Sequence, residues 1–116
     1  MAKRKPKPRR RREPVATSDY SDAAGNVLTL RRELSPGTIA KLGERPGSAA
    51  ASIEDAWQRR EEMLFERLVV RWEIAGLPID DQAMLVGRYR MAAPEERRWI
   101  RETIDDHLAR FLPELL

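Results

Sequence analysis

The chain of 116 residues is long enough for one small domain, and it holds 22 lysines and arginines against 19 acids, a net charge of +3. It has no cysteine, which excludes disulfides, thiolate catalysis and cysteine metal sites and fits a reducing, cytoplasmic location. It contains no run of 18 apolar residues, so no membrane span is expected, and its basic start lacks the apolar stretch of a secretory signal.

Positive charge is concentrated at the start of the chain. Residues 1–14 hold eight basic side chains and one acid, whereas from residue 15 onward 14 basic side chains face 18 acids, so the pI of about 9.7 is a property of this arm. Prolines within the run forbid a regular helix, which predicts a disordered basic arm. The predicted nucleic-acid-binding residues are its eight cations: Lys3, Arg4, Lys5, Lys7, Arg9, Arg10, Arg11 and Arg12.

An arm of this composition suits the phosphates of DNA, RNA or the ribosome. It would bind by releasing counterions and without sequence preference, because it offers no Asn, Gln or aromatic residue to the bases. Five arginines against three lysines suit structured RNA as well as DNA. The alternatives are a solvated arm that aids solubility, an arm that folds back onto the acidic domain and, in a eukaryote, a nuclear localisation signal. Outside the arm, one lysine against thirteen arginines is typical of a high-GC bacterial coding sequence.

Residues 15–51 have the glycine and proline content of a linker. Within this segment a β-hairpin is predicted over 17–31, because Gly25 and Asn26 tolerate positive φ between two short runs that favour strand. Ser35 predicts the cap of a short helix over 36–42. A lone hairpin is marginally stable, so it would have to dock on the helices or on a partner.

Three helices are predicted from residue 52 onward, over about 53–75, 81–91 and 94–112. On the first, Trp57 lies in the central apolar stripe and Phe65 widens it, which indicates a central helix. Arg71 interrupts the stripe, either as a rim or ion-paired arginine or as an anion-binding group. The predicted fold is therefore all-α: a small three-helix bundle-like domain over 52–116, preceded by the disordered basic arm and the segment with the hairpin.

A loose cationic cluster lies on both sides of the turn between the second and third predicted helices. It is interpreted either as a set of secondary anion contacts or as part of a mixed-charge surface. Its members are Arg88, Arg90, Arg97, Arg98 and Arg101. The adjacent Asp80 and Asp81 argue against a helix-turn-helix at this point. Trp99 lies off the apolar stripe of its helix, which indicates core packing or a partner contact, and Arg101 with Asp105 is expected to form an i, i+4 pair.

No catalytic constellation is found in the sequence. The single histidine, His107, is expected at the rim of an apolar stripe, and Asp106 points away from it, so the two are no dyad. No metal-ligand spacing or phosphate-cradling loop is present, and neither an enzyme, a metal nor a cofactor is expected. The sequence therefore predicts a non-enzymatic nucleic-acid-associated accessory protein. The alternative is a protein-interaction or homo-oligomerisation module whose arm serves solubility or recruitment.

Overall fold

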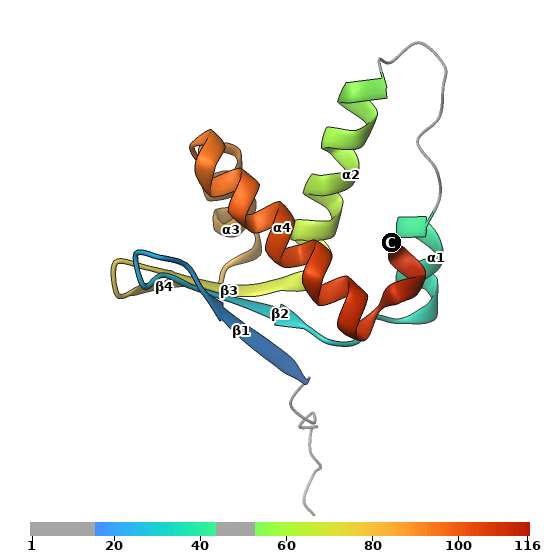
Figure 1. The fold of residues 1–116 in the computed structure, drawn as a ribbon, viewed down its shortest axis with the longest axis horizontal. Helices are drawn as coiled ribbons and strands as arrows, with labels where there is room; N and C mark the ends of the chain where they lie inside the picture. Colours follow the sequence, from blue (N-terminus) through green and yellow to red (C-terminus); the bar gives the residue numbers. More distant parts are fainter. Residues whose placement is uncertain (1–15, 44–52) are drawn as a thin grey trace, which may run out of the picture.

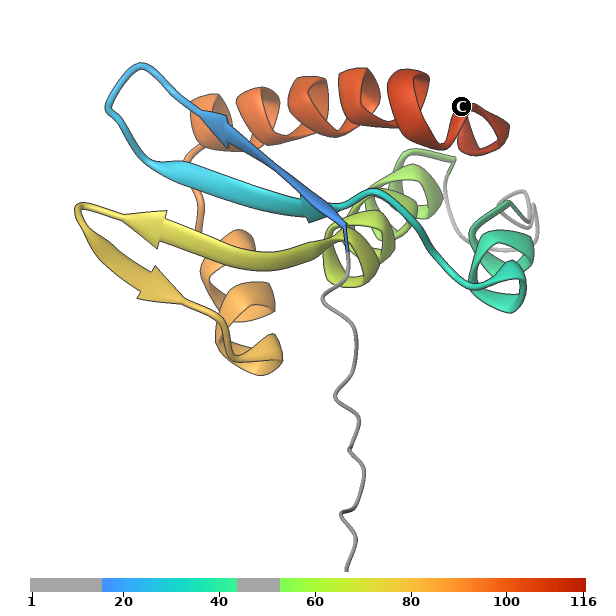
Figure 2. The same cartoon turned by 90° about the horizontal axis from the view of Figure 1, so that it is seen from below.

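A computed structural model describes residues 16–43 and 53–116, which form an antiparallel sheet in the order β1-β2-β3-β4 with helices on one side of it (Figures 1 and 2). The strands are β1 (Thr17–Ser21), β2 (Val27–Arg31), β3 (Val69–Ile74) and β4 (Leu77–Ile79). The helical elements are α1 (Pro36–Gly43), α2 (Ile53–Leu68), α3 (Gln82–Arg90), α4 (Pro94–Phe111) and the 3₁₀ turn η1 (Pro113–Leu115).

The basic arm lies outside the described residues, and with it the predicted disorder of residues 1–14. Within the two described ranges, no helix has both the length and the apolar character needed to cross a bilayer.

The expected all-α helical bundle is wrong, because residues 69–74 form a strand and not the last part of a helix. α2 ends at Leu68, and β3 begins at the next residue. In β3, Trp72 is buried in the core, whereas Arg71 and Glu73 lie on the other face and form an ion pair of 3.0 Å. Arg71 interrupts the apolar stripe of the predicted helix. In a strand, where successive side chains alternate between the two faces, it lies on the face opposite Trp72.

A two-residue turn at Ala75 and Gly76 joins β3 to β4. Both residues have positive φ, 53° and 80°, and Ile74 pairs directly with Leu77 across the turn. This is the geometry of a type I′ hairpin turn, whose twist matches that of the flanking strands. A glycine after an apolar run also ends many helices in the same left-handed conformation, which is why the sequence here resembles a helix end.

Replacing Ala75 by asparagine is expected to raise the free energy of unfolding by about 0.5–1 kcal/mol, because asparagine adopts the left-handed conformation more readily than alanine. The exposed side chain of Ala75 loses no packing, and its backbone N–H keeps its bond of 3.0 Å to Asn26 Oδ1. Urea unfolding measures the effect. Ala75→Val is the control, since a β-branched residue is strained at this φ and should destabilise. Equal stability of the two variants would contradict the turn geometry.

The hairpin expected over 17–31 is present and forms part of the core. Its loop is closed by Asp22, whose Oδ1 accepts two backbone N–H groups at 2.9 Å. On β2, Leu28 and Leu30 are fully buried in the same apolar cluster as Phe65 and Trp72. A segment with the composition of a linker therefore supplies a central strand, which a reading of local composition does not reveal.

Candidate interaction groove and cationic sites

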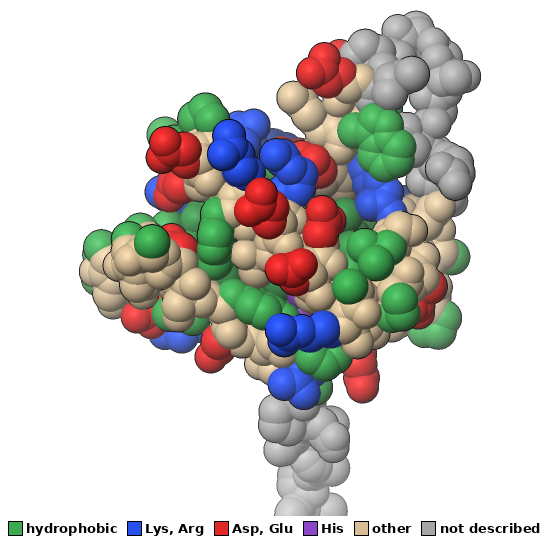
Figure 3. All heavy atoms as spheres, viewed as in Figure 1, with side chains coloured by type: hydrophobic (Ala, Val, Ile, Leu, Met, Phe, Trp, Pro, Cys, Tyr) green, Lys and Arg blue, Asp and Glu red, His purple; other side chains and the backbone are tan. Residues whose placement is uncertain are grey.

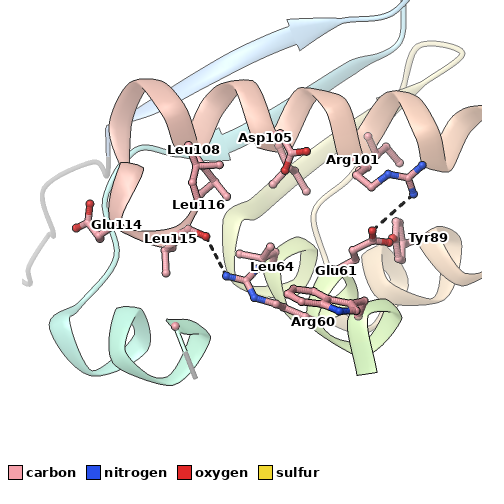
Figure 4. Close-up of a pocket in the computed structure, with 14 residues that line it drawn as sticks. Arg60, Glu61, Leu64, Tyr89, Arg101, Asp105, Leu108, Glu114, Leu115 and Leu116 are labelled. Carbon is pink, nitrogen blue, oxygen red and sulfur yellow. Dashed lines mark hydrogen bonds and ion pairs between the residues drawn. The ribbon is translucent and has the colours of Figure 1, made fainter. Parts of the chain in front are cut away.

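A groove of about 440 Å³ lies between α2, α4 and η1 (Figure 4). Its floor is made of buried aliphatic side chains, three of which come from α4 at intervals of four residues and so lie on one face of that helix. The floor residues are Leu64, Ile100, Ile104, Leu108 and Leu115.

The rim of the groove is polar, and its two arginines are already engaged. Arg60 donates to the carbonyl of Leu115 at 2.9 Å, which ties η1 to α2, and its guanidinium lies 5.9 Å from the ring centroid of Trp57. Arg101 lies 3.6 Å from Glu61 across the groove. Trp57 remains 45% exposed at the rim, an unusual amount of open apolar area for so large a side chain.

Two carboxylates of the lining, Asp105 and Glu114, form no ion pair with any residue in the described ranges. Burial raises the pKa of the Asp105 carboxyl, although Arg101 acts in the opposite direction. Both carboxylates belong to the side of the groove formed by α4 and η1 (Figure 4). The lining therefore carries a surplus of negative charge beside an apolar floor.

The cationic cluster predicted at the α3–α4 turn is mostly engaged with neighbouring groups. Arg88 forms an ion pair of 2.8 Å with Glu96, and Arg90 holds Glu62 through two hydrogen bonds of 2.7 and 3.0 Å. The bond from Arg90 lowers the pKa of Glu62. Arg97 donates to the backbone carbonyl of Arg90 at 2.7 Å. These side chains connect α2, α3 and α4, and Figure 3 shows basic and acidic groups interspersed over these helices.

The last two sequence candidates in this region, Arg98 and Trp99, differ in their surroundings. Trp99 is partly buried and packs against the core, as expected of a large aromatic side chain. Arg98 is exposed and forms no ion pair with a described residue. Of the five predicted anion contacts in the cluster, Arg97 and Arg98 thus form no ion pair within the described part of the chain, and Arg98 is the exposed one of the two.

Three further arginines lie near residues 16 and 17, the first residues that the structure describes; we call Arg31, Arg32 and Arg110 the arm-root arginines. The N–H of Arg32 donates to the carbonyl of Ala16 at 2.9 Å, and the charges of Arg32 and Arg110 both act on the nearby His107. None of the three pairs with a described acid. Arg31 and Arg32 are adjacent in the sequence, but their position beside Ala16 and Thr17 follows from the pairing of β1 with β2. The eight arm cations themselves lie outside the described residues.

His107 is fully buried and links α4 to the β1–β2 hairpin, so the expected rim position is wrong. Its Nε2 lies 2.6 Å from the carbonyl oxygen of Arg31, which can only accept, so Nε2 carries the proton. Nδ1 then accepts from the hydroxyl of Tyr20 at 2.7 Å. Burial lowers the pKa of the ring, although the bond to Arg31 favours the charged form. With both nitrogens engaged, His107 connects the two layers of the fold.

No cluster of three His, Cys, Asp or Glu side chains suited to a metal ion occurs among the described residues. Comparisons of the chain with protein-family models, curated proteins and solved structures found no match. The proposals on the function of this protein are therefore based on its charge distribution and on the groove.

Proposed function

We propose that the protein is a non-enzymatic nucleic-acid-associated accessory protein that binds phosphate groups through its N-terminal arm. The observation that carries this proposal is the segregation of charge. Eight cations and one acid occupy residues 1–14, whereas the rest of the chain has more acids than bases. Closely spaced cations bind a polyphosphate by releasing its counterions, which requires charge density but no fixed shape of the binding segment.

The folded domain supports a division of roles between its arginines and those of the arm. Around α3 and α4, Arg88 and Arg90 are held by glutamates, and their role is to join helices. The arm-root arginines have no such acidic partners among the described residues, and two of them lie beside residues 16 and 17. In this proposal they add phosphate contacts to those of the arm. RNA, the ribosome or DNA would be bound without sequence preference, and a cytoplasmic location belongs to the same proposal.

Replacing all eight arm cations by glutamine in the full-length chain is expected to weaken binding to duplex DNA and structured RNA by about 100-fold or more at low salt, since each neutralised phosphate contributes counterion release. For the parent chain on duplex DNA we expect log Kobs to fall against log salt with a slope of about −4 to −7. For the arm variant we expect a slope near zero. Fluorescence anisotropy across a salt series measures both quantities.

Two further variants locate the contacts. Arg67→Gln on α2 is the matched control, because this arginine is exposed, forms no ion pair with a described residue and belongs to none of the predicted anion contacts; it should change affinity by less than about two-fold. Replacing the three arm-root arginines by glutamine should weaken binding by roughly 3- to 10-fold. Equal binding by the parent and the arm variant would contradict the proposal. So would a parent chain that prefers an acidic peptide to both nucleic acids.

A further inference from the structure

The groove between α2, α4 and η1 is unsuited to phosphate, because three carboxylates, Glu61, Asp105 and Glu114, face two arginines, Arg60 and Arg101, among the described residues of its lining. We propose that it docks one amphipathic helix of a protein partner, with bulky aliphatic side chains on the apolar face and a lysine or arginine flanking them. This interaction is independent of phosphate binding by the arm.

The apolar floor has the dimensions of a helix-binding groove. Ile100, Ile104 and Leu108 recur every four residues on α4 and span about 12 Å along its axis. A docked helix presents anchor side chains at positions i, i+3, i+4 and i+7, which cover nearly the same length. The groove volume of about 440 Å³ lies within the range of roughly 300–1,000 Å³ found for binding clefts. It therefore accommodates the anchor side chains of one helix face.

Two large apolar side chains beside the floor remain open to water. Leu116, the residue after η1, is 68% exposed, and Trp57 on α2 is 45% exposed. A helix lying over the floor would cover both side chains and gain the free energy of removing their apolar area from water. Tryptophan at the rim is also a residue type that is enriched at protein interfaces.

The charge of the lining selects the partner. Arg60 donates to the Leu115 carbonyl and Arg101 pairs with Glu61, whereas Asp105 and Glu114 form no ion pair with a described residue. The charges of Arg101 and Arg60 act on Asp105 but do not outweigh its desolvation. The raised pKa of the Asp105 carboxyl is the mark of a carboxylate whose desolvation is not fully compensated. A lysine or arginine on the partner would supply that compensation, and an acidic helix would be repelled.

The arm of the same chain is a poorer occupant of this groove. Residues 3–14 match its negative charge, but they consist of Lys, Arg, Pro and one Glu. They provide no aliphatic anchor for a floor of leucine and isoleucine, and their prolines prevent the helix that would present one. A partner helix with an apolar face and a flanking cation matches both the apolar floor and the negative charge of the groove.

The experiment is a selection from a displayed library of helical peptides, randomised at one face and its flanks, against the full-length protein. We expect enriched peptides with Leu, Ile, Phe or Met at i, i+3 or i+4 and i+7 and with a flanking Lys or Arg. The double variant Asp105→Asn, Glu114→Gln should bind the selected peptide about 10-fold more weakly, because a close charge pair is lost. The nucleic-acid affinity of this variant should equal that of the parent.

Asp106→Asn is the matched control, since Asp106 is the exposed neighbour of Asp105 and does not line the groove; it should alter peptide affinity by less than about two-fold. Absence of enrichment, an acidic consensus, or unchanged binding by the double variant would overturn the proposal. Self-association lost in the double variant would assign the groove to a second copy instead. Tighter peptide binding by the arm variant would show that the arm occupies it.

Discussion

Replacing Phe65 by alanine is expected to lower the free energy of unfolding by about 4 kcal/mol. The ring is fully buried, stacks on Tyr89 with centroids 4.5 Å apart and meets Trp72 at 5.8 Å with its plane inclined by 67°. It thereby joins α2 to α3 and β3. Because domains of this size are stable by roughly 5–15 kcal/mol, the loss would be a large part of the total. Urea unfolding followed by circular dichroism measures it.

The control for this substitution is Trp57→Ala on the same helix. Trp57 is larger than Phe65 but 45% exposed, and its removal should cost less than about 1 kcal/mol. The pair also distinguishes the two folds, because the expected bundle has Trp57 in its central stripe and Phe65 at the margin. A loss below about 1 kcal/mol for Phe65→Ala, or a larger loss for Trp57→Ala, would contradict the core at the junction of α2, α3 and β3.

The elements that follow from local chemistry are those that the sequence predicts. Asp22 and Gly25 lie in a hairpin loop, Pro94 begins α4, and Ser35 accepts a hydrogen bond from the N–H of Thr38 at the start of α1. Residues 69–79 are different. Their apolar positions fit a helix about as well as a strand, and short apolar runs do not settle the choice. What decides it is pairing of β3 with β2, a segment remote in the sequence.

The candidate sites divide in the same way. The eight arm cations are evident from composition, but the groove depends on how α2, α4 and η1 meet, which no local pattern contains. The i, i+4 spacing predicts a pair between Arg101 and Asp105. In the structure, Arg101 instead lies 3.6 Å from Glu61 on another helix, and Asp105 forms no ion pair with a described residue. Tertiary contacts thus decide which charges are available for a partner.

Replacing His107 by leucine is expected to lower the free energy of unfolding by about 2–3 kcal/mol, because it removes the partners of two polar groups. The carbonyl of Arg31 loses its donor at 2.6 Å and the hydroxyl of Tyr20 its acceptor at 2.7 Å, while leucine keeps the site apolar and filled. The control is Asp106→Asn on the adjacent, exposed residue, which should change the free energy of unfolding by less than about 0.5 kcal/mol.

The same histidine should make the stability of the parent chain depend on pH. The unfolded chain binds a proton at His107 as the pH falls through about 6.5, whereas burial holds the pKa of the folded ring below that value. Its contribution to stability is therefore complete above about pH 6.5 and is lost as the pH falls toward the folded pKa. Between about pH 7.5 and 5.5 we expect the free energy of unfolding of the parent to fall, by no more than about 1.4 kcal/mol, the limit for one group with an unfolded pKa of about 6.5.

This dependence on pH should be absent from His107→Leu, whose lower stability should stay nearly constant over the same interval. Because the chain has one histidine, an NMR titration of its ring protons assigns the pKa of the folded state directly. Tyr20→Phe removes the hydrogen bond to Nδ1 but keeps the titrating ring, so it should be less stable by about 1 kcal/mol and retain the pH dependence. A folded-state pKa at or above about 6.5 would contradict a buried neutral ring, since desolvation then would not outweigh the bond to Arg31.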